Sequence, residues 1–98
     1  SALLTHREKP NEAEVRVAID KAEQMAALKG SWIWVYGVLD ILNTMERDYT
    51  ESLIKGDNAE ARGGLKALRA FQDKIDETIN RGVQLRKKQK QAVKPTEQ

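Results

Sequence analysis

Hydrophobic residues recur every three or four positions through most of this chain, which is the period of an amphipathic α-helix. Prolines occur only at Pro10 and Pro95, so no residue between them removes a backbone donor from a helix. The spacing predicts an all-α fold with helices at about residues 12–29, 32–55 and 58–91. The expected inward-facing residues are Val15, Ala18, Ile19, Ala22, Met25 and Ala26 in the first helix, Val35, Val38, Leu39, Leu42, Met45, Tyr49 and Leu53 in the second, and Ala61, Leu65, Leu68, Phe71, Ile75 and Ile79 in the third.

Capping residues mark the start and the end of the first helix. Asn11 is followed three residues later by Glu14, which predicts a capping box in which each side chain accepts a hydrogen bond from the other residue's backbone amide. Gly30 is expected to end the helix, because glycine adopts the left-handed cap conformation at little cost. Ser31 then has the side chain to cap the second helix.

The residues that typically end one helix and begin the next lie closest together between the second and third helices. Gly56 is expected to end one helix in the left-handed conformation, Asp57 to cap the next, and Glu60 to complete a second capping box. So short a connection predicts a tight turn, and therefore a long antiparallel hairpin with the first helix as a shorter third element.

The inward-facing residues of the two hairpin helices also align when the chain is folded back at this turn. The expected facing pairs are Leu53 with Ala61, Tyr49 with Leu65, Met45 with Leu68, Val38 with Ile75, and Val35 with Ile79. Continued further, the alignment places Trp32 opposite Gly82. The third helix then overhangs its partner by roughly 13 Å, at 1.5 Å per residue, which leaves Val83 and Leu85 without an intramolecular partner.

The domain organisation expected from this pattern is simple. A chain of 98 residues supports one small hydrophobic core. We expect a flexible or partner-ordered arm at residues 1–10, a single helical domain at 11–92 with a basic, overhanging C-terminal helix, and a tail at 93–98.

The segment KGSWIWVYGVLDIL, Lys29 to Leu42, interrupts the polar pattern with large apolar residues at every position from Trp32 to Tyr36. It is too short to span a membrane, which takes about 20 apolar residues, so we expect no membrane association. Two interpretations remain open. In the first, helix 32–55 is central and buried on two sides, with Ile33, Gly37 and Ile41 facing the first helix.

In the second interpretation, Trp34 lies on neither packing face and anchors a partner, together with Trp32 and Tyr36. Tryptophan and tyrosine are favoured at such anchors because they bury a large area at little entropic cost. We favour Trp34 as the anchor, since aliphatic residues already fill both faces, and we expect Trp34→Ala to cost less stability than Trp32→Ala. The predicted partner-binding residues are Trp32, Trp34, Tyr36, Val83 and Leu85.

Charge separates the C-terminal residues from the rest of a chain whose net charge is only +2. From position 81 onward, Glu97 is the only acidic residue, and the basic residues are Arg81, Arg86, Lys87, Lys88, Lys90 and Lys94. Beside the aromatic run, these cations have the character of a single-stranded nucleic-acid or acidic-partner site, which joins phosphate neutralisation to base stacking. A solvated helix end explains the same residues.

Residues that support catalysis or cofactor binding are sparse. The chain has no cysteine, and its one histidine, His6, lies in the N-terminal arm. Asp73, Asp76 and Glu77 form an acidic cluster that fits either a hard cation or a salt-bridged surface. No phosphate-binding glycine loop and no nucleophile–base pair is present, so we expect no catalytic residue, no metal site, no cofactor and no enzyme activity.

The segment ERDYTESLIKGDNAEARGGLKALRAFQDKI, Glu46 to Ile75, resembles small helical-hairpin proteins from the structural and assembly gene modules of tailed bacteriophages. The shared features are a charged helix, a Gly-Asp turn, an Ala-Arg-Gly step and a helix rich in leucine and arginine. The resemblance covers about a third of the chain.

What the resemblance implies is a non-enzymatic component of a phage particle, found in the virion or the host cytoplasm. Its partners would be larger virion proteins, copies of itself in a homo-oligomer, or both. The alternative function is a small nucleic-acid-binding or regulatory helical protein that uses the basic C-terminal helix.

Overall fold

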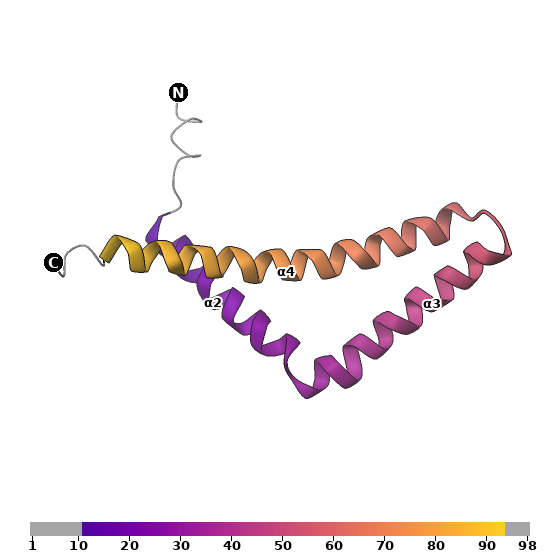
Figure 1. The fold of residues 1–98 in the computed structure, drawn as a ribbon, viewed down its shortest axis with the longest axis horizontal. Helices are drawn as coiled ribbons and strands as arrows, with labels where there is room; N and C mark the ends of the chain where they lie inside the picture. Colours follow the sequence, from indigo (N-terminus) through magenta and orange to yellow (C-terminus); the bar gives the residue numbers. More distant parts are fainter. Residues whose placement is uncertain (1–10, 94–98) are drawn as a thin grey trace, which may run out of the picture. The chain divides into compact units, whose positions relative to one another are not determined.

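The computed structural model describes residues 11–93, and side chains over residues 11–91 (Figure 1). The chain forms α2 (Glu12–Lys29), a π-helical segment η1 (Trp34–Val38), α3 (Leu39–Lys55) and α4 (Ala59–Val93). Within this range there are three α-helices and no strand, which confirms the all-α fold. The predicted arm at 1–10 and positions 94–98 of the predicted tail lie outside the described residues.

Two compact units make up the chain. Over the described residues, unit 1 combines 11–25 with 77–93, and therefore holds most of α2 and the second half of α4. Unit 2 is Ala26–Asp76, which holds the end of α2, η1, α3 and the first half of α4. The boundaries between the two units fall inside α2 and inside α4. The single domain expected at 11–92 stays a prediction.

The first capping box is present as predicted. The Asn11 Oδ1 atom accepts from the backbone N–H of Glu14 at 2.8 Å, and the Glu14 Oε1 atom accepts from the backbone N–H of Asn11 at 3.2 Å. Two otherwise unpaired donors are thereby satisfied, and such a cap contributes about 1 kcal/mol to helix stability.

The connection from α2 to η1 is also capped, but not in the predicted conformation. The helix ends at Lys29, just before Gly30, as predicted. No described residue has a left-handed backbone, so the conformation predicted for Gly30 is wrong. The turn is held by Ser31 instead, whose N–H and hydroxyl both donate to the carbonyl of Leu28, at 2.9 and 2.6 Å. The Ser31 Oγ atom accepts from the N–H of Trp34 at 3.3 Å, so its predicted capping role is confirmed.

The turn between α3 and α4 lies at the predicted residues and has a different cap. Gly56 is extended, with φ 166° and ψ 170°, so its predicted left-handed conformation is wrong. Asn58, not Asp57, caps α4, because its Oδ1 atom accepts from the N–H of Ala61 at 3.1 Å. Asp57 forms an ion pair with Arg62 instead. The chain turns between Lys55 and Ala59 without any left-handed residue.

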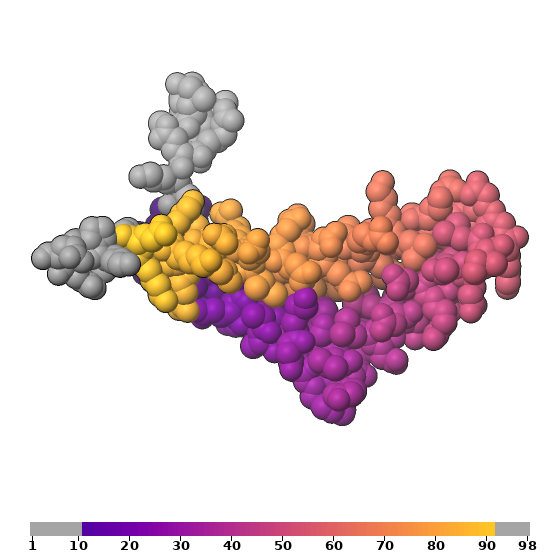
Figure 2. Space-filling model, viewed as in Figure 1, coloured from indigo at the N-terminus to yellow at the C-terminus, as the bar shows by residue number. Residues whose placement is uncertain are grey.

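In unit 2, α3 packs against the first half of α4, as the hairpin predicts. The ring of Tyr49 lies on Gly64, where an added Cβ atom would overlap it. Ala61 and Leu42 are buried. Figure 2 shows the atoms of α3 in contact with those of α4 near the turn. Two of the core residues expected on α3 and on the first half of α4, Met45 and Phe71, are exposed, so the interior between these helices is narrower than predicted.

In unit 1, α2 packs against the second half of α4. A Cβ atom added at Gly82 would overlap the side chain of Ala22 and lie 3.1 Å from the carbonyl oxygen of Ala18. Ile19 and Ala22 are buried. Gly82 therefore meets α2, and its predicted position opposite Trp32 is wrong.

Small side chains explain this packing. Alanine on α2 and glycine on α4 let the two backbones approach closely, which larger residues would prevent. The Arg86 guanidinium and the Glu23 carboxylate, 2.6 Å apart, extend the contact toward the C-terminus. The sequence predicted that α4 is uncovered beyond residue 82. This prediction is wrong as far as Arg86, because α2 contacts α4 up to that residue. Leu85 is half-buried, while Val83 is 44% exposed.

Candidate functional site

The aromatic run begins with one turn of π-helix. The backbone N–H of Leu39 donates to the carbonyl of Trp34, five residues earlier, where an α-helix would use the residue four earlier. One extra residue is therefore held in this turn. Such π-turns are rare and occur frequently at functional positions.

The extra residue decides which aromatic side chain is buried. In an α-helix, residues five apart differ by about 140° around the axis, so Trp34 and Leu39 would lie on different faces. The π-turn brings them to one side, and Trp34 is only 4% exposed. The prediction that Trp34 is an exposed anchor is therefore wrong. Val35, expected inside, is exposed in its place.

Trp32, Ile33 and Tyr36 form the opposite, outward side of the run, here called the aromatic patch. Their side chains are 73%, 55% and 68% exposed. The rings of Trp32 and Tyr36 contact each other, with centroids 5.7 Å apart and planes tilted by 44°. The interpretation that Ile33 and Ile41 face the first helix is wrong, because both are exposed. That helix packs on α4 instead.

The stretch of sequence that contains the aromatic patch carries few charged residues. Between Met25 and Leu39, Lys29 is the only residue with a basic or acidic side chain. Its Nζ atom lies 2.6 Å from a carboxylate oxygen of Asp76. Apolar, aromatic and poorly charged surfaces are typical of the centres of protein interfaces. The patch therefore has the composition of a docking surface.

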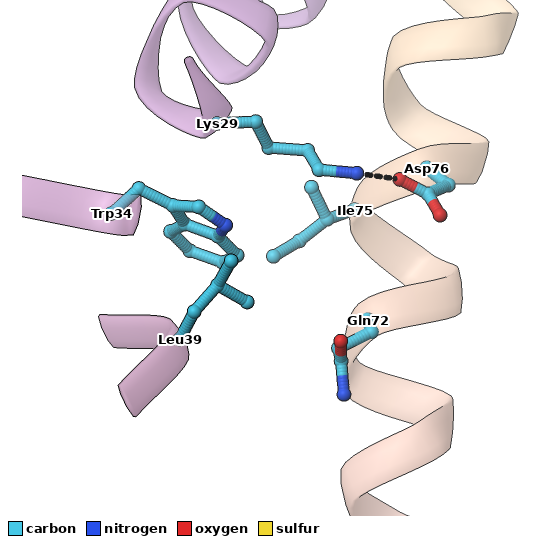
Figure 3. A pocket seen from close by; sticks show the side chains of 6 residues that line it. All are labelled: Lys29, Trp34, Leu39, Gln72, Ile75 and Asp76. Carbon is cyan, nitrogen blue, oxygen red and sulfur yellow. Dashed lines mark hydrogen bonds and ion pairs between the residues drawn. The ribbon is translucent and has the colours of Figure 1, made fainter. Parts of the chain in front are cut away.

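A pocket of about 190 Å³ lies on the other side of the π-turn (Figure 3). Trp34 and Leu39 line it from one side, and Ile75 and Gln72 line it from α4. The ion pair between Lys29 and Asp76 stands at its edge. All of these residues belong to unit 2.

The remaining predicted site residues belong to unit 1. Arg86 is paired with Glu23. The other predicted nucleic-acid contacts are all exposed on α4, and they are Arg81, Lys87, Lys88 and Lys90. The roles of Val83 and Leu85 in partner binding stay predictions. The structure thus brings Trp32 and Tyr36 together, and it places the basic residues in the other unit.

Within residues 11–93, no group of three or more histidine or acidic side chains is arranged to hold a metal ion. Asp76, from the predicted acidic cluster, is paired with Lys29. No single helix in that range is long and apolar enough to cross a membrane. One bent pair, Glu12–Lys29 with Trp34–Lys55, meets the criteria of length and composition when taken together.

Sequence reasoning missed several of these residues. Ile33 was assigned to an internal face, although its position between two exposed aromatic residues was visible. Lys29 and Gln72 line the pocket although no sequence pattern pointed to them, and Asp76 was noted only as part of an acidic cluster. The i, i+4 spacing of Trp32 and Tyr36 indicates that the two rings share one side of a helix, but it does not show whether that side faces the interior or the surface.

No protein-family model, curated protein or solved structure matches this chain. The resemblance of Glu46–Ile75 to small phage proteins therefore stays a prediction.

Proposed function

We propose that this chain is a non-catalytic helical interaction protein that binds a larger protein through the aromatic patch. The observation that carries the proposal is the pairing of Trp32 with Tyr36 on the surface, with both rings more than two-thirds exposed. The resemblance of Glu46–Ile75 favours a tailed-phage particle as the setting and larger virion proteins as the partners. The alternative protein partner is a second copy of this chain.

The size of the patch fits an anchor within a larger interface. Each aromatic side chain buries about 150–250 Å² when covered. At about 25 cal/mol per Å², covering the exposed parts of Trp32 and Tyr36 contributes on the order of 5–10 kcal/mol. Association itself costs about 4–15 kcal/mol. A stable complex therefore needs further contacts around the patch, which a larger partner supplies.

Site-specific photo-crosslinking tests the proposal in cells that make the protein natively. A benzophenone amino acid is placed at position 32, at position 36 or, as the control, at position 54. Ile54 is equally apolar and 79% exposed, and it lies at the far end of α3. We expect one identified protein to be crosslinked from positions 32 and 36 and not from 54. Equal adducts from all three positions would contradict the proposal.

Sedimentation separates the two kinds of partner. If copies of this chain cover the patch, the purified protein sediments as an oligomer at high concentration, and Trp32→Ser returns it to a monomer. A monomer at every concentration assigns the patch to a foreign protein. The Ile54→Ser variant controls for a general loss of surface hydrophobicity.

A second function, binding to nucleic acid, is favoured by the exposed cations at the end of α4. Arg81, Lys87, Lys88 and Lys90 are exposed, and the segment from Arg81 to Val93 contains no acidic residue. Affinity for a single-stranded oligonucleotide is measured by anisotropy at several salt concentrations. Counterion release lowers log K by about 0.7 per log unit of salt for each neutralised phosphate. Replacing the three lysines by glutamine should therefore reduce this slope by about 2. Binding that does not depend on salt excludes this function.

A further inference from the structure

The pocket beside the π-turn has an apolar interior and a polar edge. Trp34, Leu39 and Ile75 supply the apolar surface, and Gln72 stands on the α4 side (Figure 3). The side chains of Lys29 and Asp76 are 39% and 59% exposed, so their ion pair marks the solvent side of the pocket. The edge is electrically neutral, because these two charges compensate each other.

The indole N–H of Trp34 is a hydrogen-bond donor that no described residue uses. Trp34 is 96% buried, and yet no fully covered side-chain nitrogen or oxygen among residues 11–91 lacks a partner. This N–H therefore reaches the open space of the pocket. Figure 3 shows the indole nitrogen on the edge of the ring that faces Ile75. No described residue accepts from this donor, so a ligand acceptor placed in the pocket can pair with it.

An acceptor also lies on the opposite wall. The amide nitrogen of Gln72 donates to the carbonyl oxygen of Leu68 at 3.5 Å. Its own carbonyl oxygen forms no hydrogen bond with a described residue, so it can accept one from a ligand. The pocket thus presents one donor and one acceptor around an apolar centre.

We propose that this pocket binds one neutral aromatic ring carrying a hydroxyl group. An apolar cavity of about 150 Å³ holds one benzene molecule, so about 190 Å³ leaves room for a single ring with a substituent. The hydroxyl oxygen accepts from the Trp34 N–H, and its proton is donated to the Gln72 carbonyl. A charged ligand is disfavoured, because the only charges at the pocket already neutralise each other.

Free phenols and the tyrosine side chain of another protein share this chemistry. The proposal does not rest on the aromatic patch, because Trp32, Ile33 and Tyr36 do not line the pocket. Failure of the crosslinking experiment would therefore leave the pocket proposal intact, and the reverse also holds.

The two tryptophans provide a probe and its internal control. Each gives one indole N–H signal in a ¹⁵N–¹H correlation spectrum of the full chain, and the Trp32→Phe variant assigns them. We expect p-cresol to move the Trp34 signal saturably downfield while the Trp32 signal stays in place. An unmoved Trp34 signal at the solubility limit of p-cresol, or equal shifts of both signals, would overturn the proposal.

Toluene tests the hydroxyl group, since it has the same ring and methyl group without an acceptor. We expect a smaller and weaker shift of the Trp34 signal with toluene, and equal titrations would overturn the assigned hydrogen bond. Ile75→Phe should fill the pocket and abolish the p-cresol shift, with circular dichroism confirming that the variant is helical. The toluene comparison uses the unaltered chain, so it tests the proposed hydrogen bond even if the Ile75→Phe variant does not fold.

N-acetyltyrosine amide separates the two sources of the ring. A shift as large as that with p-cresol shows that the pocket admits a tyrosine presented on a peptide backbone. A shift with p-cresol alone assigns the pocket to free phenols. Both results support a hydroxylated aromatic ring as the ligand.

Discussion

The ring of Tyr49 in α3 lies on the backbone of Gly64 in α4, so closely that no Cβ atom fits between them. Its neighbour Gly63 faces open space. The two glycines share one helix and one stretch of sequence, but only Gly64 is required by a contact. The pair therefore separates the effect of packing from the effect of helix propensity.

Gly64→Ala should destabilise the protein, and Gly63→Ala should stabilise it. The added methyl at 64 overlaps the Tyr49 ring, and overpacking of this kind costs about 1–3 kcal/mol. At 63 the methyl meets nothing, and replacing glycine by alanine inside a helix gains about 0.5–1 kcal/mol. Urea denaturation of both variants measures the difference. Changes of the same sign would contradict the packing of α3 on α4.

Gly82→Ala should destabilise unit 1 through its contact with Ala22. The added methyl overlaps the Ala22 side chain, so Ala22→Gly should recover part of the loss. Contacting residues typically show coupling energies of about 0.5–3 kcal/mol in a double-mutant cycle. The single and double variants are compared by thermal unfolding. Additive effects would show that α2 does not pack on α4 at this position.

Trp34→Ala should cost about 3–5 kcal/mol of unfolding free energy, as expected when a buried tryptophan is truncated. Trp32→Ala should change it by less than about 0.5 kcal/mol, because that side chain is 73% exposed. Chemical denaturation of the two variants provides the comparison. A larger loss for Trp32→Ala would reverse the assignment of inner and outer faces.

Gly56→Val should be tolerated, although glycine at a helix end is commonly left-handed. The backbone of Gly56 is extended, which β-branched residues adopt readily, and a Cβ atom there meets nothing within 4 Å. We expect a change of less than about 0.5 kcal/mol, or a small gain from a stiffer unfolded chain. A drop in melting temperature as large as that of Gly82→Ala would show that the turn has another conformation.

Local signals in the sequence were sufficient for the helices and most of their ends. Asn11 with Glu14 and the cap at Ser31 were identified from side-chain chemistry alone, because these contacts join residues three positions apart. The hairpin turn was located correctly as well. Its cap was assigned to Asp57 and not to Asn58, since both side chains can accept the same hydrogen bond.

The inner and outer faces of the aromatic run could not be predicted in the same way. A stripe of apolar residues assumes a constant 3.6 residues per turn, and η1 breaks that assumption at Trp34. No residue type encodes a π-turn by itself. The packing of α2 on α4 was missed for another reason. Its contact is made by Ala18, Ala22 and Gly82, whose small side chains give a weak hydrophobic signal.

The π-turn has a consequence at the level of the gene. Holding one additional residue in a helical turn is equivalent to a one-codon insertion. Removing one codon would rotate the preceding residues of the helix by about 100° around its axis, relative to the residues that follow. The same tryptophans, tyrosine and isoleucine would then exchange places between the interior and the surface. In this segment, the number of residues in the turn determines which aromatic side chain is buried in the fold and which one lies on the surface.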